Sequence, residues 1–297
     1  MELVIPAPAR FNFRRTVLSH GWSLLPPFEL DRQSWVLRRV LSVPGRRPMV
    51  AAFREAGRGV AVAIEPARLS ARAVGELAHQ TVTIFGLDVN LEPFYKVAAR
   101  QPDMRWVGRD GAGRLLRSPT VFEDVIKLIL STNCPWSATR QMVHALVEMG
   151  EPTAGGRRAF PPPAVVALAA EQRLRETGRA GYRAPAVAAV AEAVASGTED
   201  IEAWVRLPAA EVRRRARRLK GVSPYVIDNL LGLLGHGRGL GLDSWVRSVL
   251  AERAGRELSD REIAERYESF GEHAGLALWC DVTRDVVEHP SVQAPVV

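Results

Sequence analysis

The hydrophobic periodicity of the chain changes once, near residue 70, and this change restricts the fold more than any other feature. Before it, β-branched and aromatic residues alternate roughly with polar ones over residues 11–18, 34–43 and 48–64, with turn sequences between these segments. Short alternating segments of this kind are typical of antiparallel strands. After it, apolar residues recur at helical spacing. The pattern predicts an α+β fold, with a small N-terminal antiparallel β-sheet domain followed by an all-helical domain.

We place the sheet domain at residues 1–80 and the helical domain at residues 81–290. Two capping-box patterns, Thr120-Val-Phe-Glu123 and Ser259-Asp-Arg-Glu262, predict the first residues of two helices. The other helices are expected where apolar residues recur every three or four positions. The expected helical ranges are 71–79, 91–99, 120–130, 137–149, 163–170, 184–195, 209–219 and 259–271.

The composition restricts the partners and the cofactors. The 297 residues carry a formal net charge of +7, which favours nucleic acid as a partner, although basic proteins without such a partner are common. Two cysteines, Cys134 and Cys280, are too few for a disulfide scaffold, a four-cysteine zinc site or a four-cysteine iron–sulfur cluster. No apolar run reaches the length of a membrane span, and residues 1–10 lack a secretory signal. We therefore expect a cytoplasmic protein with no iron–sulfur cluster and no membrane partner.

A basic helix followed by a tight turn lies between residues 209 and 231. Five arginines, at 213, 214, 215, 217 and 218, precede Gly221, after which a second apolar helix begins. The unpaired N–H groups at the start of a helix attract anions, and arginines nearby add an attraction to phosphate that does not depend on base sequence. The turn therefore predicts a phosphate site. A helix-turn-helix corner with a solvated basic face is the plain alternative.

An aspartate stands at the predicted start of the next helix. Asp243 and Ser244 follow the glycine-rich segment Gly239-Leu-Gly-Leu242. A carboxylate held there is kept ionised by the helix dipole and can stabilise positive charge that develops nearby. Aspartate is also a favoured N-cap, so a purely structural role for Asp243 is the alternative.

These segments together resemble the helix-hairpin-helix–GPD superfamily of DNA glycosylases. In that family a hairpin of the form L-x-G-V-G is followed by a catalytic aspartate at a helix start. Leu219, Gly221 and Val222 match the hairpin and Asp243 matches the aspartate. Ser223 departs from the pattern, since it stands where the family has its second glycine.

Three further blocks extend the resemblance over residues 80 to 285, toward 8-oxoguanine DNA glycosylases and bacterial 3-methyladenine DNA glycosylase II. They are Gly113–Pro119 with Phe122–Asp124 and Ile129–Asn133, then Gly181–Ala184, and Phe85–Asp88 with Phe94-Tyr95. The resemblance implies a wedge loop at 131–136, a second probing loop around Tyr182, and a DNA-gripping hairpin at 219–225. Residues expected to contact DNA are Asn133, Tyr182, Arg183, Lys220, Gly221, Val222, Ser223 and Tyr225.

The resemblance also assigns roles to some of these residues. Asn133 would fill the space of a flipped base, while Arg183 would hydrogen-bond the base left unpaired. Ordinary loop polarity is the alternative for both, and simple packing is the alternative for Tyr182. In relatives the hairpin carbonyls hold a monovalent cation, sodium or potassium. The matching carbonyls belong to Arg217, Leu219 and Val222, and no other cofactor is expected.

The expected activity is hydrolysis of the N-glycosidic bond of a damaged base, in base excision repair, by a monomer acting on double-stranded DNA. Relatives that also nick the strand carry a lysine where this chain has Tyr225, and Lys220 lies on the other side of the turn. The sequence therefore predicts a monofunctional glycosylase, nucleoid-associated if bacterial. A bifunctional glycosylase/lyase and a non-catalytic DNA-binding module are the alternatives.

The base itself is predicted from the pocket positions. Asn229, Trp245 and Leu278 differ from the residues that the resemblance places around 8-oxoguanine. Trp136, Trp245 and Trp279 are electron-rich rings that can stack on a cationic base, which favours alkylated purines. An oxidised base remains an alternative, as does a structural role for each tryptophan. The expected base pocket consists of Trp136, Asn229, Trp245, Leu278 and Trp279.

Overall fold

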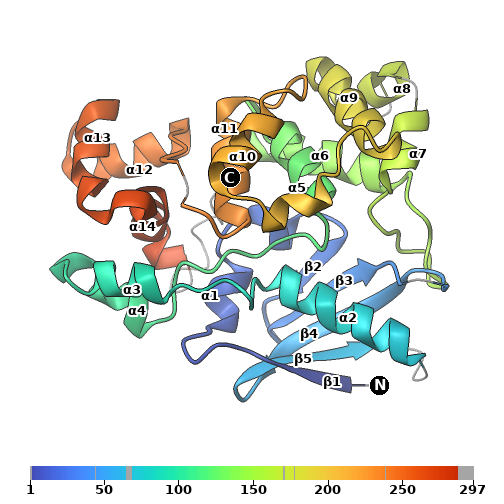
Figure 1. Cartoon of the computed structure of the whole chain (residues 1–297), viewed down its shortest axis with the longest axis horizontal. Coiled ribbons are helices and arrows are strands. Elements are labelled where there is room, and N and C mark those ends of the chain that lie inside the picture. Colours follow the sequence, from blue (N-terminus) through green and yellow to red (C-terminus); the bar gives the residue numbers. More distant parts are fainter. Residues whose placement is uncertain are drawn as a thin grey trace.

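A computed structural model describes residues 2–43, 45–64, 69–169, 171–176, 178–237 and 239–286. It has a five-stranded antiparallel sheet at the N-terminus and a helical body after it, so the predicted α+β fold is confirmed (Figure 1). The sheet order is β1-β5-β4-β3-β2. The strands are β1 (Glu2–Pro6), β2 (Phe28–Asp31), β3 (Val36–Leu41), β4 (Met49–Ala56) and β5 (Gly59–Ile64).

The strand predictions are right for the second half of the sheet and wrong for the first. Residues 11–18 form no strand; α1 (Phe13–Val17) lies there, because the Asn12 side chain accepts the Arg15 amide and caps a helix. Strands β1 and β2 were not predicted from the sequence. The range 48–64 contains two strands joined by a turn at residues 57 and 58, which pair from Ala51↔Ile64 to Ala56↔Gly59.

The helical part follows the predicted order. Helix α2 (Ala71–Ile84) lies along the sheet, and the helices from α3 onward form the body above and beside it (Figure 1). The body consists of α3 (Glu92–Ala98), α4 (Arg105–Arg109), α5 (Val121–Leu130), α6 (Trp136–Val147), α7 (Pro163–Leu168), α8 (Glu171–Glu176), α9 (Ala184–Ala195), α10 (Ala209–Ala216), α11 (Pro224–Leu233), α12 (Ser244–Ala254), α13 (Asp260–Tyr267) and α14 (Ala274–Val282). Within the described ranges, no helix is long and apolar enough to cross a membrane.

One of the two predicted capping boxes is complete. Ser259 Oγ accepts the Glu262 amide and the Glu262 carboxylate accepts the Ser259 amide, as predicted. At α5 only the first half forms: Thr120 Oγ1 accepts the Glu123 amide at 3.3 Å. The Glu123 carboxylate turns inward to other partners. The two α5 amides that open the helix, at Val121 and Phe122, donate to Glu202 instead.

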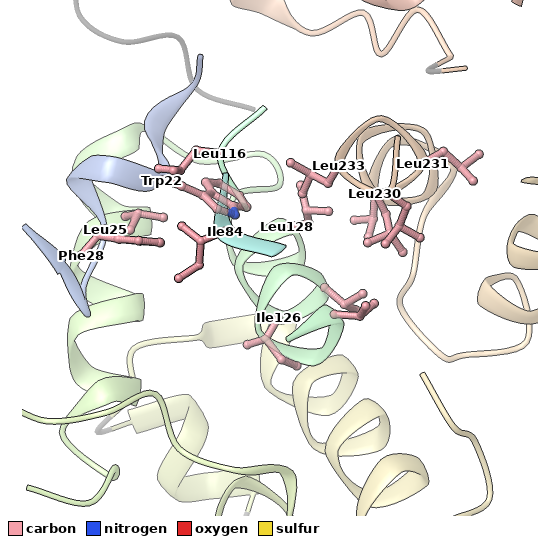
Figure 2. Packing of buried hydrophobic residues seen from close by; sticks show 14 of the residues in the cluster. Trp22, Leu25, Phe28, Ile84, Leu116, Ile126, Leu128, Leu230, Leu231 and Leu233 are labelled. Carbon is pink, nitrogen blue, oxygen red and sulfur yellow. The ribbon is translucent and has the colours of Figure 1, made fainter. Parts of the chain in front are cut away.

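Helix α5 is the centre of the molecule, since all ten of its residues are buried. Figure 2 shows Leu128 of α5 between Trp22 from the N-terminal part and Leu233 from α11. A single cluster of buried apolar side chains extends through the sheet and the helical body. The two predicted domains therefore share one core, and the predicted limit at residue 290 lies outside the described residues.

Charged groups lie inside this core, between the sheet and α5. Arg39 of β3 and Lys127 of α5 both pair with Glu123, Lys127 Nζ at 2.6 Å, and none of the three side chains is more than 2% exposed. Burial raises the pKa of the Glu123 carboxyl, but the charges of Arg39 and Lys127 outweigh burial and hold it below its ordinary range. These ion pairs fix the sheet against the helix that carries the wedge loop.

Candidate active site

The hairpin connects α10 to α11 through a turn that only glycine fits. Gly221 has φ +82°, and a Cβ on it would lie 2.2 Å from Cβ of Ala186 in α9. The next side chain, Val222, is buried and anchors the turn to the core. The hairpin backbone is thus held against α9, while Lys220 and Gly221 are exposed at its tip.

Ser223 shows why its departure from the family pattern is tolerated. Its φ is −75°, which any residue adopts, and its Oγ accepts the Val226 amide at 3.3 Å as the N-cap of α11. Glycine is therefore not needed at this position, and the serine hydroxyl accepts a hydrogen bond from one backbone amide in the first turn of α11.

The basic helix before the turn is less available to DNA than the sequence suggests. Arg213 pairs with Asp228 of α11 at 2.8 Å, and Arg214 and Arg215 pair with Glu211. Three of the five arginines are therefore paired with carboxylates and are less free to attract phosphate. The two arginines closest to the turn are exposed, as is the hairpin lysine: Arg217, Arg218 and Lys220.

The segment that leads from α11 to Asp243 is rich in glycine because it makes three close backbone contacts. A Cβ on Gly235 would meet the Val89 side chain at 2.9 Å, and one on Gly237 would meet the Glu272 carbonyl oxygen at 2.3 Å. A Cβ on Gly239 would lie 2.4 Å from Oδ2 of Asp228. Asp228, which sequence reasoning missed, thus supports both the hairpin and the loop that positions Asp243.

Asp243 caps a helix, as the structural alternative predicted, and its carboxylate has a second hydrogen-bond donor as well. It is the N-cap of α12, where its Oδ1 accepts the Val246 amide at 2.7 Å. Its Oδ2 accepts the hydroxyl of Tyr225 at 3.3 Å. The carboxylate is partly exposed, so it is oriented by two donors and still reachable from solvent. Tyr225 belongs to the first turn of α11, directly after the hairpin.

Three of the five predicted base-pocket residues are buried, which corrects their assignment as contact residues. Asn229 donates its amide to the Tyr225 carbonyl at 2.9 Å and is 1% exposed. Leu278 and Trp279 are core residues of α14, and the Trp279 indole N–H donates to the Ser19 carbonyl. Trp245 is partly exposed, with its ring centroid 6.0 Å from that of Trp279. Trp245, two residues after Asp243 in the chain, is thus an aromatic ring of the expected pocket that is partly exposed to solvent.

Trp136 lies at the start of α6 and packs against the N-terminal part. A Cβ on Gly21 would lie 2.5 Å from its ring, so the indole rests on the backbone there. The contact anchors the end of the wedge loop.

The wedge candidate is exposed at the tip of the loop between α5 and α6. Asn133 has φ +47°, a left-handed conformation that asparagine tolerates better than most residues. The carbonyl just before it, on Thr132, accepts the Nε–H of Arg183 at 3.0 Å and a second guanidinium N–H. The loop is therefore tied to the segment around η3 (Gly181–Arg183).

Arg183 is not placed to hydrogen-bond a base, which corrects its predicted role. It is 7% exposed and directs its guanidinium to the wedge loop. Tyr182 remains 61% exposed, with the Arg183 guanidinium 4.3 Å from its ring centroid. The exposed ring beside the wedge loop is consequently that of Tyr182, and Arg183 contacts both this ring and the Thr132 carbonyl.

The described residues hold no cluster of three or more histidine, cysteine or acidic side chains that would bind a metal ion. The hairpin offers carbonyl oxygens instead. The Leu219 carbonyl accepts the Val222 amide at 3.2 Å and keeps a second lone pair. The Leu219 carbonyl, one of the three expected to hold a monovalent cation, therefore keeps an acceptor site for a hard cation.

Comparisons with solved structures identify this fold. MBOgg1, solved with a low-affinity DNA ligand, is similar over 96% of each chain, with a TM-score of 0.73 and 19% identity. The 3-methyladenine DNA glycosylase from Archaeoglobus fulgidus covers 95% of this chain and 98% of its own, with a TM-score of 0.71 and 19% identity. The 8-oxoguanine glycosylase/lyase from Clostridium acetobutylicum covers 95% of both chains, with a TM-score of 0.71 and 17% identity.

No protein-family model matches the chain, and no curated protein sequence matches it. The structural similarity nevertheless extends over nearly the whole chain, the N-terminal sheet included. The chain therefore has the fold of these DNA glycosylases, as the sequence motifs predicted. Fold similarity at this level of identity does not extend to the reaction.

Proposed function

We propose that this protein is a DNA glycosylase of base excision repair that hydrolyses the N-glycosidic bond of a damaged base with Asp243. The observation that carries the proposal is the placement of Asp243. Its carboxylate is oriented by the Val246 amide and the Tyr225 hydroxyl, at the end of a loop braced against the hairpin. A site built only to cap a helix would not need the second donor.

The reaction requires the nucleotide to leave the duplex, which costs a few kcal/mol. Asn133 and Tyr182, both exposed on adjacent loops, would occupy the vacated space. The exposed hairpin tip would hold the backbone beyond the lesion through its amides and through Lys220. These contacts together would keep the sugar of the flipped nucleotide near Asp243.

The chemistry follows from the carboxylate. As the C1′–N bond breaks, the base departs with the bonding electrons and positive charge develops on the sugar. The Asp243 carboxylate stabilises that charge, as carboxylates do in glycoside hydrolysis. A water molecule then adds its oxygen to C1′, and its proton passes to Asp243 or to solvent. The product is a free base and an abasic sugar.

We infer that the enzyme is monofunctional. Strand nicking by a lyase needs an amine that attacks C1′ and forms a Schiff base. The side chain beside Asp243 is the Tyr225 hydroxyl, which cannot form one. Lys220 is exposed at the hairpin tip, on the other side of the turn from Tyr225.

We also propose that an alkylated purine is the preferred base. Support comes from Trp245, whose partly exposed ring lies against Trp279 and can stack on a cationic base. The Archaeoglobus fulgidus structure, a 3-methyladenine DNA glycosylase, has the same fold. A sodium or potassium ion at the hairpin carbonyls belongs to the same proposal, and so does action as a cytoplasmic monomer.

A panel of duplexes tests the proposal, each with one lesion: 3-methyladenine, 7-methylguanine, hypoxanthine, uracil or 8-oxoguanine. We expect strand breaks only after hot alkali, with an alkylated purine, and none with Asp243→Asn. Asp260→Asn is the matched control, because Asp260 is an exposed carboxylate that begins the next helix. Breaks without alkali and a borohydride-trapped adduct would establish a lyase. Tight binding without excision of any base would establish a non-catalytic module.

A further inference from the structure

A groove lies beside the wedge loop, along the exposed face of α6. Its volume is about 510 Å³. It is lined by Arg140, Gln141 and His144 of α6, by Arg179, and by the apolar side chains of Leu24 and Pro26, among others. We call it the α6 groove. Neither the hairpin nor Asp243 contributes to it, so it is separate from the candidate active site.

The α6 groove is basic. No aspartate or glutamate lies among its lining residues, whereas Arg140 and Arg179 are both exposed there. Arg179 donates to Oε1 of Gln141 at 3.1 Å, which draws its guanidinium over α6. Its φ of +52° is unusual for arginine. Two guanidinium groups on one groove attract an anion with oxygen acceptors.

The position of the groove indicates which anion. Arg140 lies on the second turn of α6, directly after the wedge loop that ends at Trp136. Arg179 lies just before Tyr182, on the segment that supports the wedge. A duplex seated on Asn133 and Tyr182 would therefore continue over the groove, and its backbone would bring phosphates there.

Which DNA strand the groove contacts follows from the function proposed above, on which this inference rests. Asp243 must reach the sugar of the damaged nucleotide, so the hairpin and Asp243 together occupy the damaged strand. The wedge residues fill the space of the flipped base and thus face its former partner. The α6 groove follows the wedge loop in the chain and shares no residue with the hairpin, and on this basis we assign it to the other strand.

We propose that the α6 groove binds backbone phosphates of the strand opposite the damaged base, through Arg140 and Arg179. Because these contacts are made to phosphate, they add affinity that depends on salt and not on the opposite base. The groove makes the protein prefer duplex over single-stranded DNA.

Binding is measured by fluorescence anisotropy on a duplex with a tetrahydrofuran abasic analogue, which needs no excision. The double variant Arg140→Ala/Arg179→Ala should bind the duplex about tenfold more weakly, and the slope of log affinity against log salt should fall by about two. Its affinity for the single abasic strand should not change. Arg54→Ala/Arg261→Ala removes the same charge from exposed sites and should leave the slope unchanged. Arg140→Lys/Arg179→Lys should retain the slope, which shows that charge is the cause.

Neutral methylphosphonate linkages then locate the strand. Placed in the undamaged strand near the lesion, they should weaken binding of the wild-type protein and have no further effect on the alanine double variant. An unchanged salt slope, or an effect confined to linkages in the damaged strand, would overturn the inference. If no base is excised but the slope falls as expected, the proposed function fails and the groove stands. If a base is excised but the salt slope of the double variant is unchanged, the proposed function stands and the inference about the groove fails.

Discussion

The hydroxyl of Tyr225 donates to Oδ2 of Asp243, although the two residues are 18 positions apart in the chain. The other carboxylate oxygen accepts the Val246 amide. The contact joins the hairpin to the proposed catalytic acid, so that the element expected to grip DNA also orients the group expected to break the bond.

Tyr225→Phe removes this donor and keeps the ring. A hydrogen bond to a charged group contributes about 1.5–3 kcal/mol, and at 3.3 Å we expect the lower end, a fall in kcat of about tenfold with KM little changed. Single-turnover excision measures it. Tyr267→Phe is the control, because Tyr267 makes the same kind of bond to Asp281 away from the site. An unchanged kcat in Tyr225→Phe would mean that the contact does not orient Asp243 for catalysis.

Arg183→Ala removes the support of the wedge loop. We expect excision from a fully paired duplex to fall about tenfold, because two charged hydrogen bonds to the Thr132 carbonyl are lost. The fall should be equal for all four opposite bases, and smaller on single-stranded substrate. A loss that depends strongly on the opposite base would instead mean that Arg183 reads that base directly.

Gly221→Ala should disrupt the hairpin, since its Cβ would lie 2.2 Å from that of Ala186 and its φ is +82°. We expect weaker DNA binding and a loss of stability. Gly197→Ala is the matched control: φ there is +73° but no atom lies within 4 Å of the added Cβ. Gly197→Ala should lose about 1–2 kcal/mol from backbone strain and bind DNA normally. Equal DNA affinity in both variants would argue against a role of the hairpin in binding.

Glu123→Gln should lower the free energy of unfolding by about 3–5 kcal/mol, because it leaves Arg39 and Lys127 buried without a counter-charge. Urea denaturation measures the loss. Glu265→Gln breaks an exposed pair with Arg261 and should change stability by no more than about 0.5 kcal/mol. A small effect at Glu123 would mean that water reaches the buried pair.

Asp124→Asn tests the pH dependence of stability. Burial raises the pKa of the Asp124 carboxyl above its ordinary value of 3.8, so the folded state binds the proton more tightly than the unfolded chain. The proton therefore stabilises the folded state. This stabilisation is complete below pH 3.8 and is lost as pH rises through the raised pKa of Asp124. Asparagine keeps an oxygen for the Trp22 and Ser118 donors and does not ionise. The variant should therefore gain stability over the wild type as pH rises from 3.8 through the raised pKa of Asp124. A constant difference across this range would show that Asp124 does not titrate in it.

Local sequence signals predicted the parts of the fold that depend on neighbouring residues. The capping box at Ser259, the helix start at Asp243 and the turn at Gly221 all appear as expected. Residues 11–18 were misassigned because a short run with alternating apolar residues also fits one helical turn, and the Asn12 cap decides between them. Glu123 does not complete the predicted capping box, because its carboxylate pairs with the buried side chains of Arg39 and Lys127.

The sequence by itself determined the order of sheet and helices, the hairpin, and the presence of an aspartate at a helix start beyond it. The tertiary structure decided which side chains remain available. In the folded chain Arg183, Asn229 and Trp279 are buried, and the Tyr225 hydroxyl contacts Asp243. The physical reason is that periodicity and capping act between residues a few positions apart, whereas burial and ion pairing depend on elements that meet only after the chain has folded.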